Sequence, residues 1–189
     1  MTITELAPPL GEPLTLAETK AHLRVETSAD DALLTALIAT VRDYLERETG
    51  LALLTRTFRL YLDGWPMSRV IPIGRGPVQT IEAVTVYDAA GGPVAVDTSG
   101  FTLDGQARPA RLILPSQPEP GLAINGIEID FSAGFGASGT DVPDVLKRAM
   151  LLHAALLYEF RGAVPPNSQP AAVPLGYDRL IAPFCRRRL

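Results

Sequence analysis

The spacing of apolar residues changes twice along this chain, and those changes limit the folds that it can adopt. Between residues 28 and 50 the apolar residues recur every three to four positions, which is typical of an amphipathic helix. In "TRTFRLYLDGW", by contrast, Phe58, Leu60 and Leu62 alternate with polar residues, which is typical of a half-buried strand. Helical spacing returns in "DVPDVLKRAMLLHAALLYEFRG". The sequence therefore predicts an α+β protein with helices on both sides of a β segment.

Residues that start and stop helices sharpen this prediction. Thr15 and Glu18 have the spacing of a reciprocal capping box for a short helix. Ser28 is suited to cap the long helix that follows, and Gly50 is suited to end it. Pro143 falls in the first turn of a third helix, where a missing backbone N–H costs little. Gly162 is predicted to end that helix.

The chain divides into four predicted parts. Residues 1–51 are expected to form the N-terminal helical part of a scaffold, and residues 52–135 an inserted β unit. Gaps between strands are too short for helical crossovers, so roughly six short strands are expected to be mostly antiparallel. Residues 136–162 form the C-terminal helical part. Residues 163–189 form a proline-rich spacer and a tail.

Composition excludes several classes of protein. The net charge is −4, although general nucleic-acid binders are usually basic, and no apolar run approaches the roughly 20 residues that a membrane span needs. The first residues lack the pattern of a signal peptide, so a cytosolic protein without membrane contact is expected. One cysteine, Cys185, and two histidines, His22 and His153, give neither a disulfide framework nor a zinc site. We expect neither a metal nor a cofactor.

Candidate catalytic features are few. "GFGASG", from Gly134 to Gly139, has the G-x-G-x-x-G spacing of a dinucleotide loop, but no second parallel strand follows it, which favours a β-to-helix hinge. His153 lies on the apolar face of the third helix and is interpreted as a core or interface residue. Cys185 has arginines beside it but no partner base, so it is interpreted as part of a docking segment. No enzyme signature remains.

The C-terminal segment "RLIAPFCRRRL" combines apolar residues with arginines. Residues 141–189 carry 4 acids and 7 bases, a net charge of +3, whereas residues 1–50 carry 9 acids and 4 bases, a net charge of −5. Apolar anchors beside arginines are the composition that protein interfaces favour. The predicted docking residues are Leu180, Ile181, Pro183, Phe184, Arg186, Arg187, Arg188 and Leu189. Contact with a nucleic-acid backbone and a simple solvated tail are the alternatives.

Two blocks of the sequence resemble the head-tail connector (adaptor) proteins of tailed bacteriophages and gene transfer agents. The blocks are roughly residues 13–54, from "PLTLAETKAHLRVE" to "YLERETGLAL", and residues 131–162, "FSAGFGASGTDVPDVLKRAMLLHAALLYEFRG". The matching residues are Leu16, Lys20, His22, Leu23, Arg24, Asp31, Leu34, Ile38, Tyr44, Glu46, Thr49, Gly50, Ala133, Gly134, Pro143, Ala149, Leu157, Tyr158 and Arg161.

This resemblance implies a structural virion protein that is made in the bacterial cytoplasm and located at the head-tail interface. It implies a dodecameric ring below the portal that extends the DNA channel, with a tail-side stopper protein as the next partner. The C-terminal segment would dock on the portal, and DNA would pass without sequence-specific binding. Asp43 and Glu46, on the outer side of the long helix, are the candidates for an acidic channel lining. The alternatives are a small nucleotide-binding enzyme using Gly134–Gly139 or a nucleic-acid-binding module using the basic C-terminus.

Overall fold

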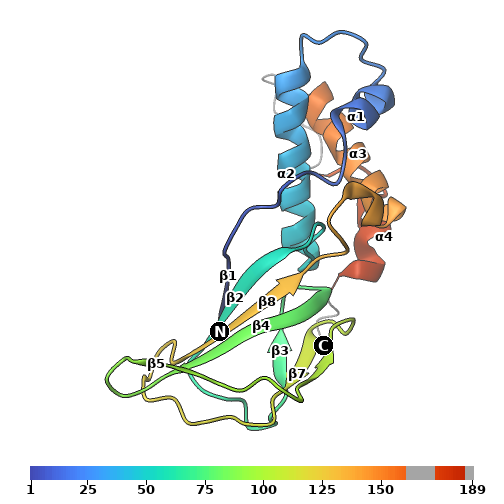
Figure 1. Ribbon diagram of the computed structural model, residues 1–189. Coiled ribbons are helices and arrows are strands. Elements are labelled where there is room, and N and C mark those ends of the chain that lie inside the picture. Colours follow the sequence, from blue (N-terminus) through green and yellow to red (C-terminus); the bar gives the residue numbers. More distant parts are fainter. Residues whose placement is uncertain (161–172, 186–189) are drawn as a thin grey trace. The chain divides into compact units, whose positions relative to one another are not determined.

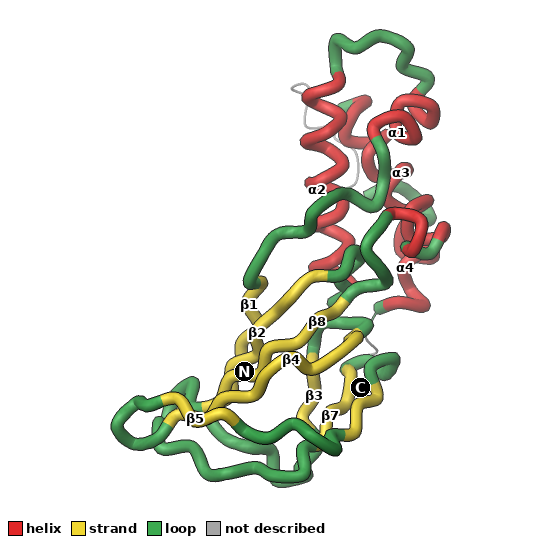
Figure 2. Tube along the Cα trace, viewed as in Figure 1, coloured by secondary structure: helices red, strands yellow, loops and turns green. Residues whose placement is uncertain are grey.

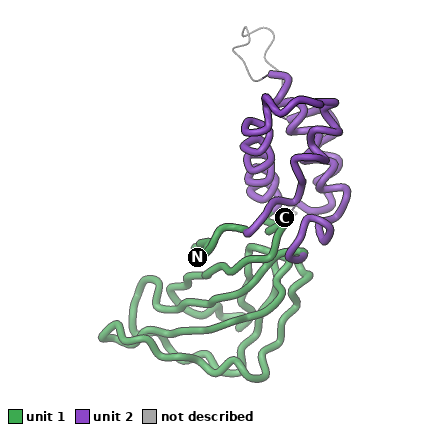
Figure 3. The backbone as a smooth tube through the Cα atoms, turned by 45° about the horizontal axis from the view of Figure 1, so that its top comes forward, with its two compact units in different colours: residues 1–9, 50–135 green, residues 10–49, 136–189 purple. Residues whose placement is uncertain are grey.

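The structure is a computed structural model, and it describes residues 1–160 and 173–185. The chain forms two compact units (Figure 3). Unit 1 comprises Met1–Pro9 and Gly50–Phe135, and unit 2 comprises Leu10–Thr49 and Gly136–Leu189. The described strands all fall in unit 1 and the α-helices in unit 2 (Figure 2). This arrangement confirms the predicted α+β class.

Unit 1 contains a five-stranded antiparallel sheet with the strand order β1-β2-β8-β4-β5 (Figure 1). Its strands are β1 (Thr2–Glu5), β2 (Arg56–Leu62), β4 (Val78–Tyr87), β5 (Pro93–Ala95) and β8 (Ile127–Ala133). Strand β1 was not predicted, because its residues show no apolar alternation in the sequence. In the structure they are mostly exposed. It is added at the sheet edge by pairing with β2, so the first nine residues belong to unit 1.

A second, three-stranded antiparallel sheet completes unit 1. It has the order β3-β7-β6, formed by β3 (Ile71–Ile73), β6 (Thr102–Asp104) and β7 (Ala110–Ile113). Apolar side chains of both sheets form one core, in which the rings of Phe58 and Phe131 stack with centroids 5.7 Å apart. The sequence predicted one β unit of about six strands, whereas the described residues form eight strands in two sheets.

The predicted alternation in β2 decides which face of the five-stranded sheet is buried. Phe58, Leu60 and Leu62 are buried, as predicted, while Arg59 lies on the opposite face. There the Arg59 Nε lies 2.6 Å from Asp130 Oδ1, and its Nη1 lies 2.9 Å from Glu128 Oε2. The hydrogen bond to Asp130 raises the pKa of Arg59 above its ordinary value. One guanidinium thereby joins two carboxylates of β8.

Unit 2 is helical. Its α-helices are α1 (Leu16–Leu23), α2 (Asp31–Thr49), α3 (Asp144–Glu159) and α4 (Tyr177–Ile181). Short 3-10 turns, η1 (Gly139–Asp141) and η3 (Ala182–Phe184), precede α3 and follow α4. Helix α2 packs against α1 and α3, and α4 packs against α3 (Figure 1).

The capping signals of the first helix are confirmed. The Glu18 N–H donates to Thr15 Oγ1 at 3.1 Å, and the Thr15 N–H donates to Glu18 Oε2 at 2.7 Å. Helix α2 begins at Asp31, so Ser28 lies before its cap position. Helix α3 ends at Glu159, and the predicted stop at Gly162 lies outside the described residues.

Apolar residues from α2 and α3 form the core of unit 2. Leu34, Ile38, Val41 and Leu45 of α2 are each at most 2% exposed. Leu146, Ala149, Met150 and Ala154 of α3 are fully buried, at 0% exposure. These positions agree with the helical spacing in the sequence, because residues three and four apart share one side of a helix.

Candidate assembly surfaces

The two predicted channel acids of α2 occupy different environments. The side chain of Asp43 is 60% exposed and accepts a hydrogen bond from Arg42 Nη1 at 2.7 Å. Glu46 is only 4% exposed, and its carboxylate lies 3.5 Å from the same Nη1. The expected exposure on the outer side of the helix is therefore wrong for Glu46. The channel role of both residues stays a prediction.

A residue that precedes α1 pairs with the arginine that lies beside Glu46. Glu12 lies in unit 2 beside α2, where its Oε2 accepts from Arg42 Nε at 2.8 Å. Arg42 is itself buried, at 8% exposure. Burial alone lowers the pKa of Arg42, but the hydrogen bond and charge of Glu12, together with the charges of Glu46 and Asp43, outweigh burial and raise that pKa. Arg42 remains a cation that compensates Glu46.

The described part of the C-terminal docking segment is folded against unit 2. Ile181 is 4% exposed, Leu180 and Phe184 are half-buried, and Pro183 is exposed. Arg186, Arg187, Arg188 and Leu189 lie outside the described residues, as does most of the predicted spacer. The structure thus separates the apolar docking residues into one that is buried in the subunit and three that have accessible surface.

Tyr177 anchors this segment, a role that was not predicted from the sequence. Its side chain is 1% exposed and lies edge-on to two other rings. The ring centroid of Tyr177 is 6.1 Å from that of Tyr44 in α2 and 5.4 Å from that of His153 in α3. Its spacing of four residues from Ile181 is the signal that would have revealed a shared helix face.

His153 completes this aromatic cluster. Its centroid lies 4.8 Å from that of Tyr44, and its side chain is 3% exposed, which confirms a core position. Burial raises the pKa of the Tyr44 phenol, and the charge of Glu48 adds to the effect. The phenol pKa of Tyr177 is also raised by burial and, to a smaller extent, by Tyr44. The phenols of Tyr44 and Tyr177 therefore remain uncharged near neutral pH. The three rings serve packing.

The glycine motif does not form an open phosphate cradle. A Cβ on Gly134 would overlap the backbone of Thr55, so this glycine permits a close approach between chain segments of unit 1. A Cβ on Gly136 would overlap the carboxylate of Asp141, which accepts from the Ser138 N–H at 2.9 Å. An acid at this position repels a phosphate. The geometry thus argues against the nucleotide-binding alternative.

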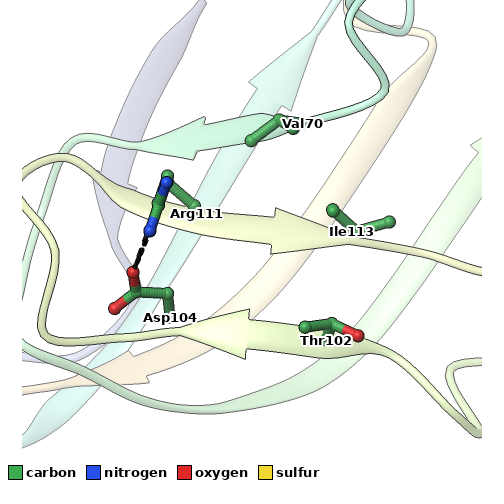
Figure 4. Close-up of a pocket in the computed structure, with 5 residues that line it drawn as sticks. All are labelled: Val70, Thr102, Asp104, Arg111 and Ile113. Atoms are coloured by element: carbon green, nitrogen blue, oxygen red, sulfur yellow. Dashed lines mark hydrogen bonds and ion pairs between the residues drawn. The ribbon is translucent and has the colours of Figure 1, made fainter.

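One shallow hollow lies on the three-stranded sheet of unit 1 (Figure 4). It has a volume of about 240 Å³ and is lined by Val70, Thr102, Asp104, Arg111 and Ile113. Arg111 and Asp104 point toward one another, with 2.5 Å between Nη2 and Oδ2. Because both side chains are well exposed, their pairing contributes little to stability. The charges of Arg111 and Asp104 are paired with each other, and the rest of the lining is mainly apolar. These five residues do not form a catalytic arrangement.

Other candidate residues show no chemistry of their own. Burial and the nearby charge of Arg148 lower the pKa of His22. Cys185 is half-buried, and its N–H donates to Ile181 O at 3.1 Å. Across residues 1–160 and 173–185, no group of three or more potential ligands is placed to hold a metal. No helix in these ranges has the length and apolarity to cross a bilayer.

The chain is similar to one known protein family and to chains of solved particle structures. The profile of the phage gp6-like head-tail connector proteins matches residues 13–90. A chain in the virion of a native gene transfer agent particle is 33% identical, with a TM-score of 0.82, over 100% of this chain and 97% of that chain. A chain in the neck of an empty gene transfer agent particle, computed with C6 symmetry, gives the same values.

A chain in the neck of a native gene transfer agent particle, computed with C12 symmetry, is 35% identical with a TM-score of 0.72. That match covers 100% of this chain and 97% of that chain. No curated protein matches the sequence. The matches to the three particle chains span the full length and so include both units of the fold. The family match includes parts of both units. The chain therefore belongs to the phage gp6-like head-tail connector family, and it is a structural protein rather than an enzyme.

Proposed function

We propose that the protein forms a ring in the neck of a phage-like particle, below the portal, where it extends the DNA channel and joins the head to the tail. The observation that carries this proposal is the full-length match to a chain of a particle neck with C12 symmetry. Both units are included in that match, which favours the same use of the whole chain. The subunit is made in the bacterial cytoplasm and works in the assembled particle.

A ring of identical subunits requires two different contact surfaces on each subunit, because its contacts run head to tail. Helices α2 and α3 supply apolar residues beyond those in the core of unit 2. Leu33 and Leu37 of α2 and Leu156 of α3 are half-buried, and Phe160, directly after α3, is 40% exposed. Covering such side chains in a neighbouring subunit is favourable. We assign much of the ring body to these two helices.

The channel lining follows from the charges that remain accessible on α2. Asp43 is exposed, whereas Glu46 is buried and compensated by Arg42. Asp43 is therefore the better candidate for an acidic surface along which DNA passes without sticking, since phosphates are repelled by carboxylates. Glu46 then acts within the subunit.

The C-terminal segment is the proposed contact with the portal. Pro183 is exposed and Phe184 is half-buried, so both have surface that a groove can cover. Arg186, Arg187 and Arg188 would pair with acids or carbonyl groups of the portal. The opposite side of the ring receives the tail-side stopper protein.

Co-sedimentation with cognate portal rings tests this proposal. The full chain is compared with a chain truncated after Pro174 and with one truncated after Cys185. The second truncation is the sharper test, because it removes the arginines and keeps Tyr177 and Ile181 in the subunit core. We expect the full chain to bind, and both truncations to lose binding. Full binding by the chain that ends at Cys185 would contradict the role of the arginines.

Particle images provide an independent test of the ring. Electron microscopy of the portal complex should show a ring of density with twelve-fold symmetry on one side of the portal. Absence of portal binding by the full chain, under salt conditions that keep both proteins soluble, would contradict the proposed position in the neck.

A further inference from the structure

Helix α4 is held on unit 2 by two side chains that point the same way. Tyr177 is 1% exposed and Ile181 is 4% exposed, and residues four apart lie on one side of a helix. The seat of α4 includes the rings of Tyr44 and His153, which lie edge-on to that of Tyr177. A side chain buried in this seat cannot fill a groove in another protein at the same time. Ile181 is therefore unavailable to a partner while α4 is docked.

Three features make this docking weak. First, α4 has only five residues, which is too short for a helix that is stable by itself. Second, Gly176 at its N-cap has a φ of 89° and provides no side-chain hydrogen bond to the helix. Third, the Tyr177 hydroxyl is buried without a hydrogen-bond partner among the described residues. A buried unpaired hydroxyl loses its hydration without compensation.

We propose that α4 is a reversible latch, which is docked on Tyr44 and His153 in the free subunit and leaves that seat when the C-terminal segment binds its partner. This inference rests on the proposed function, in which that segment binds the portal. Release makes Ile181 available together with Leu180 and Phe184, and it uncovers the seat. The free subunit thus hides part of its binding segment until a partner competes for it.

Competition sets a quantitative relation between the two states. When only a fraction of subunits has the latch open, the apparent dissociation constant equals the intrinsic one divided by that fraction. A change that tightens docking therefore weakens partner binding by the same factor. A change that loosens docking strengthens it, until the open form predominates.

Two substitutions of one residue change docking in opposite directions. Tyr177→Phe keeps the ring contacts with Tyr44 and His153 and removes the unpaired hydroxyl, whereas Tyr177→Ala removes the ring. Amide hydrogen exchange of the full chain is measured across residues 173–185, with β8 of unit 1 as the internal reference. We expect exchange to slow about threefold to tenfold in Tyr177→Phe and to accelerate at least about tenfold in Tyr177→Ala. Unchanged exchange in Tyr177→Ala would overturn the docking role of this residue.

Binding to cognate portal rings tests the release. Tyr177→Phe should bind more weakly than the unmodified chain, by the factor found for exchange, and Tyr177→Ala should bind at least as well. In the complex of the unmodified chain, amides around Tyr44 and His153 should exchange faster than in the free subunit, unless contacts with a neighbour cover them. The Tyr177→Ala variant tests for that exception, because its seat is already open in the free subunit. Slower exchange around Tyr44 and His153 when this variant binds would show that a neighbour covers the seat. Weaker binding by Tyr177→Ala with unchanged binding by Tyr177→Phe would mean that docked α4 is the binding form, which overturns the latch.

Failure of the latch and failure of the proposed function give different results. If the unmodified chain binds portal rings and the two variants reverse the expected order, the latch is wrong and the portal contact stands. If no chain binds while the exchange differences are as expected, the portal contact is wrong and the release step falls with it. The intramolecular docking of α4 then stands by itself.

Discussion

Tyr158 donates a hydrogen bond from its hydroxyl to Asp30 Oδ2 at 2.5 Å, which joins the last turn of α3 to the residue before α2. The two residues are 128 positions apart in the sequence. Lys20 Nζ lies 2.6 Å from Asp31 Oδ1, so α1 is joined to the same end of α2. Polar contacts at this end therefore fix the register of three helices whose apolar faces alone would allow some sliding.

Removing the Tyr158 hydroxyl tests the strength of this contact. Tyr158→Phe should lower the free energy of unfolding by about 1.5 to 3 kcal/mol, because hydrogen bonds to charged groups contribute about that much. Urea denaturation followed by circular dichroism measures the change. In a background of Asp30→Ala, the same substitution should have little further effect. An equal loss in both backgrounds would show that the hydroxyl acts through another group.

The buried ion cluster of α2 predicts a strong effect of Arg42. Arg42→Met leaves the carboxylate of Glu46 buried without its guanidinium, so the free energy of unfolding should fall by about 3 kcal/mol. Adding Glu46→Gln to that variant removes the buried charge and should restore part of the loss. Denaturation at one fixed pH compares the three chains. Equal stability of the single and double variants would contradict a compensating role for Arg42.

The capping box predicts an acid-dependent contribution from Glu18. Hydrogen bonds from the Thr15 backbone and side chain lower the pKa of Glu18 below its ordinary value of 4.5. A lowered pKa in the folded state means that the carboxylate stabilises the fold above about pH 4.5 and that this contribution disappears as the pH falls through the folded value. Glu18→Gln should therefore be less stable than the unmodified chain at pH 7, and the difference should shrink below pH 4.5. A difference that is constant with pH would exclude titration of Glu18 as its cause.

Two glycines of unit 1 form a matched pair for backbone strain. Gly134 has a φ of 149°, and a Cβ there would overlap the backbone of Thr55, whereas a Cβ on Gly64 would meet nothing within 4 Å. Gly134→Ala should lower the free energy of unfolding by more than about 1 kcal/mol, and Gly64→Ala should change it by less than about 0.5 kcal/mol. Thermal and urea unfolding of both variants provide the comparison. Similar losses would show that the approach to Thr55 is not the cause.

Asp43, an exposed acid of α2, gives a prediction for assembled particles. Asp43→Lys should slow DNA ejection, because a cation at the proposed channel surface attracts passing phosphates. Glu48→Lys is the control, since Glu48 is exposed on the same helix five residues further on, near Tyr44 and Tyr177. Ejection rates of particles that carry each variant, measured at two salt concentrations, decide the result. Equal rates for Asp43→Lys and unmodified particles would remove Asp43 from the channel.

Local patterns in the sequence determined the type and order of most elements. Helical spacing predicted the buried faces of α2 and α3, alternation predicted the buried face of β2, and the Thr15–Glu18 pair predicted the start of α1. These predictions are confirmed because each depends on neighbours a few residues away. The family blocks lie in the same segments, so the resemblance to head-tail connectors was accessible from the sequence as well.

Tertiary structure decided which polar and aromatic residues are covered. Arg42 and Glu46 look like outer residues of a helix, but both are buried, and Glu12 from the segment before α1 pairs with Arg42. Strand β1 has no apolar alternation, and its pairing with β2 places it in the sheet. Tyr177 became an anchor only because α2 and α3 present Tyr44 and His153 side by side. Periodicity in the sequence indicates which face of a helix or strand is apolar and will be buried. Which distant segment packs against that face depends on packing and charge in the folded chain.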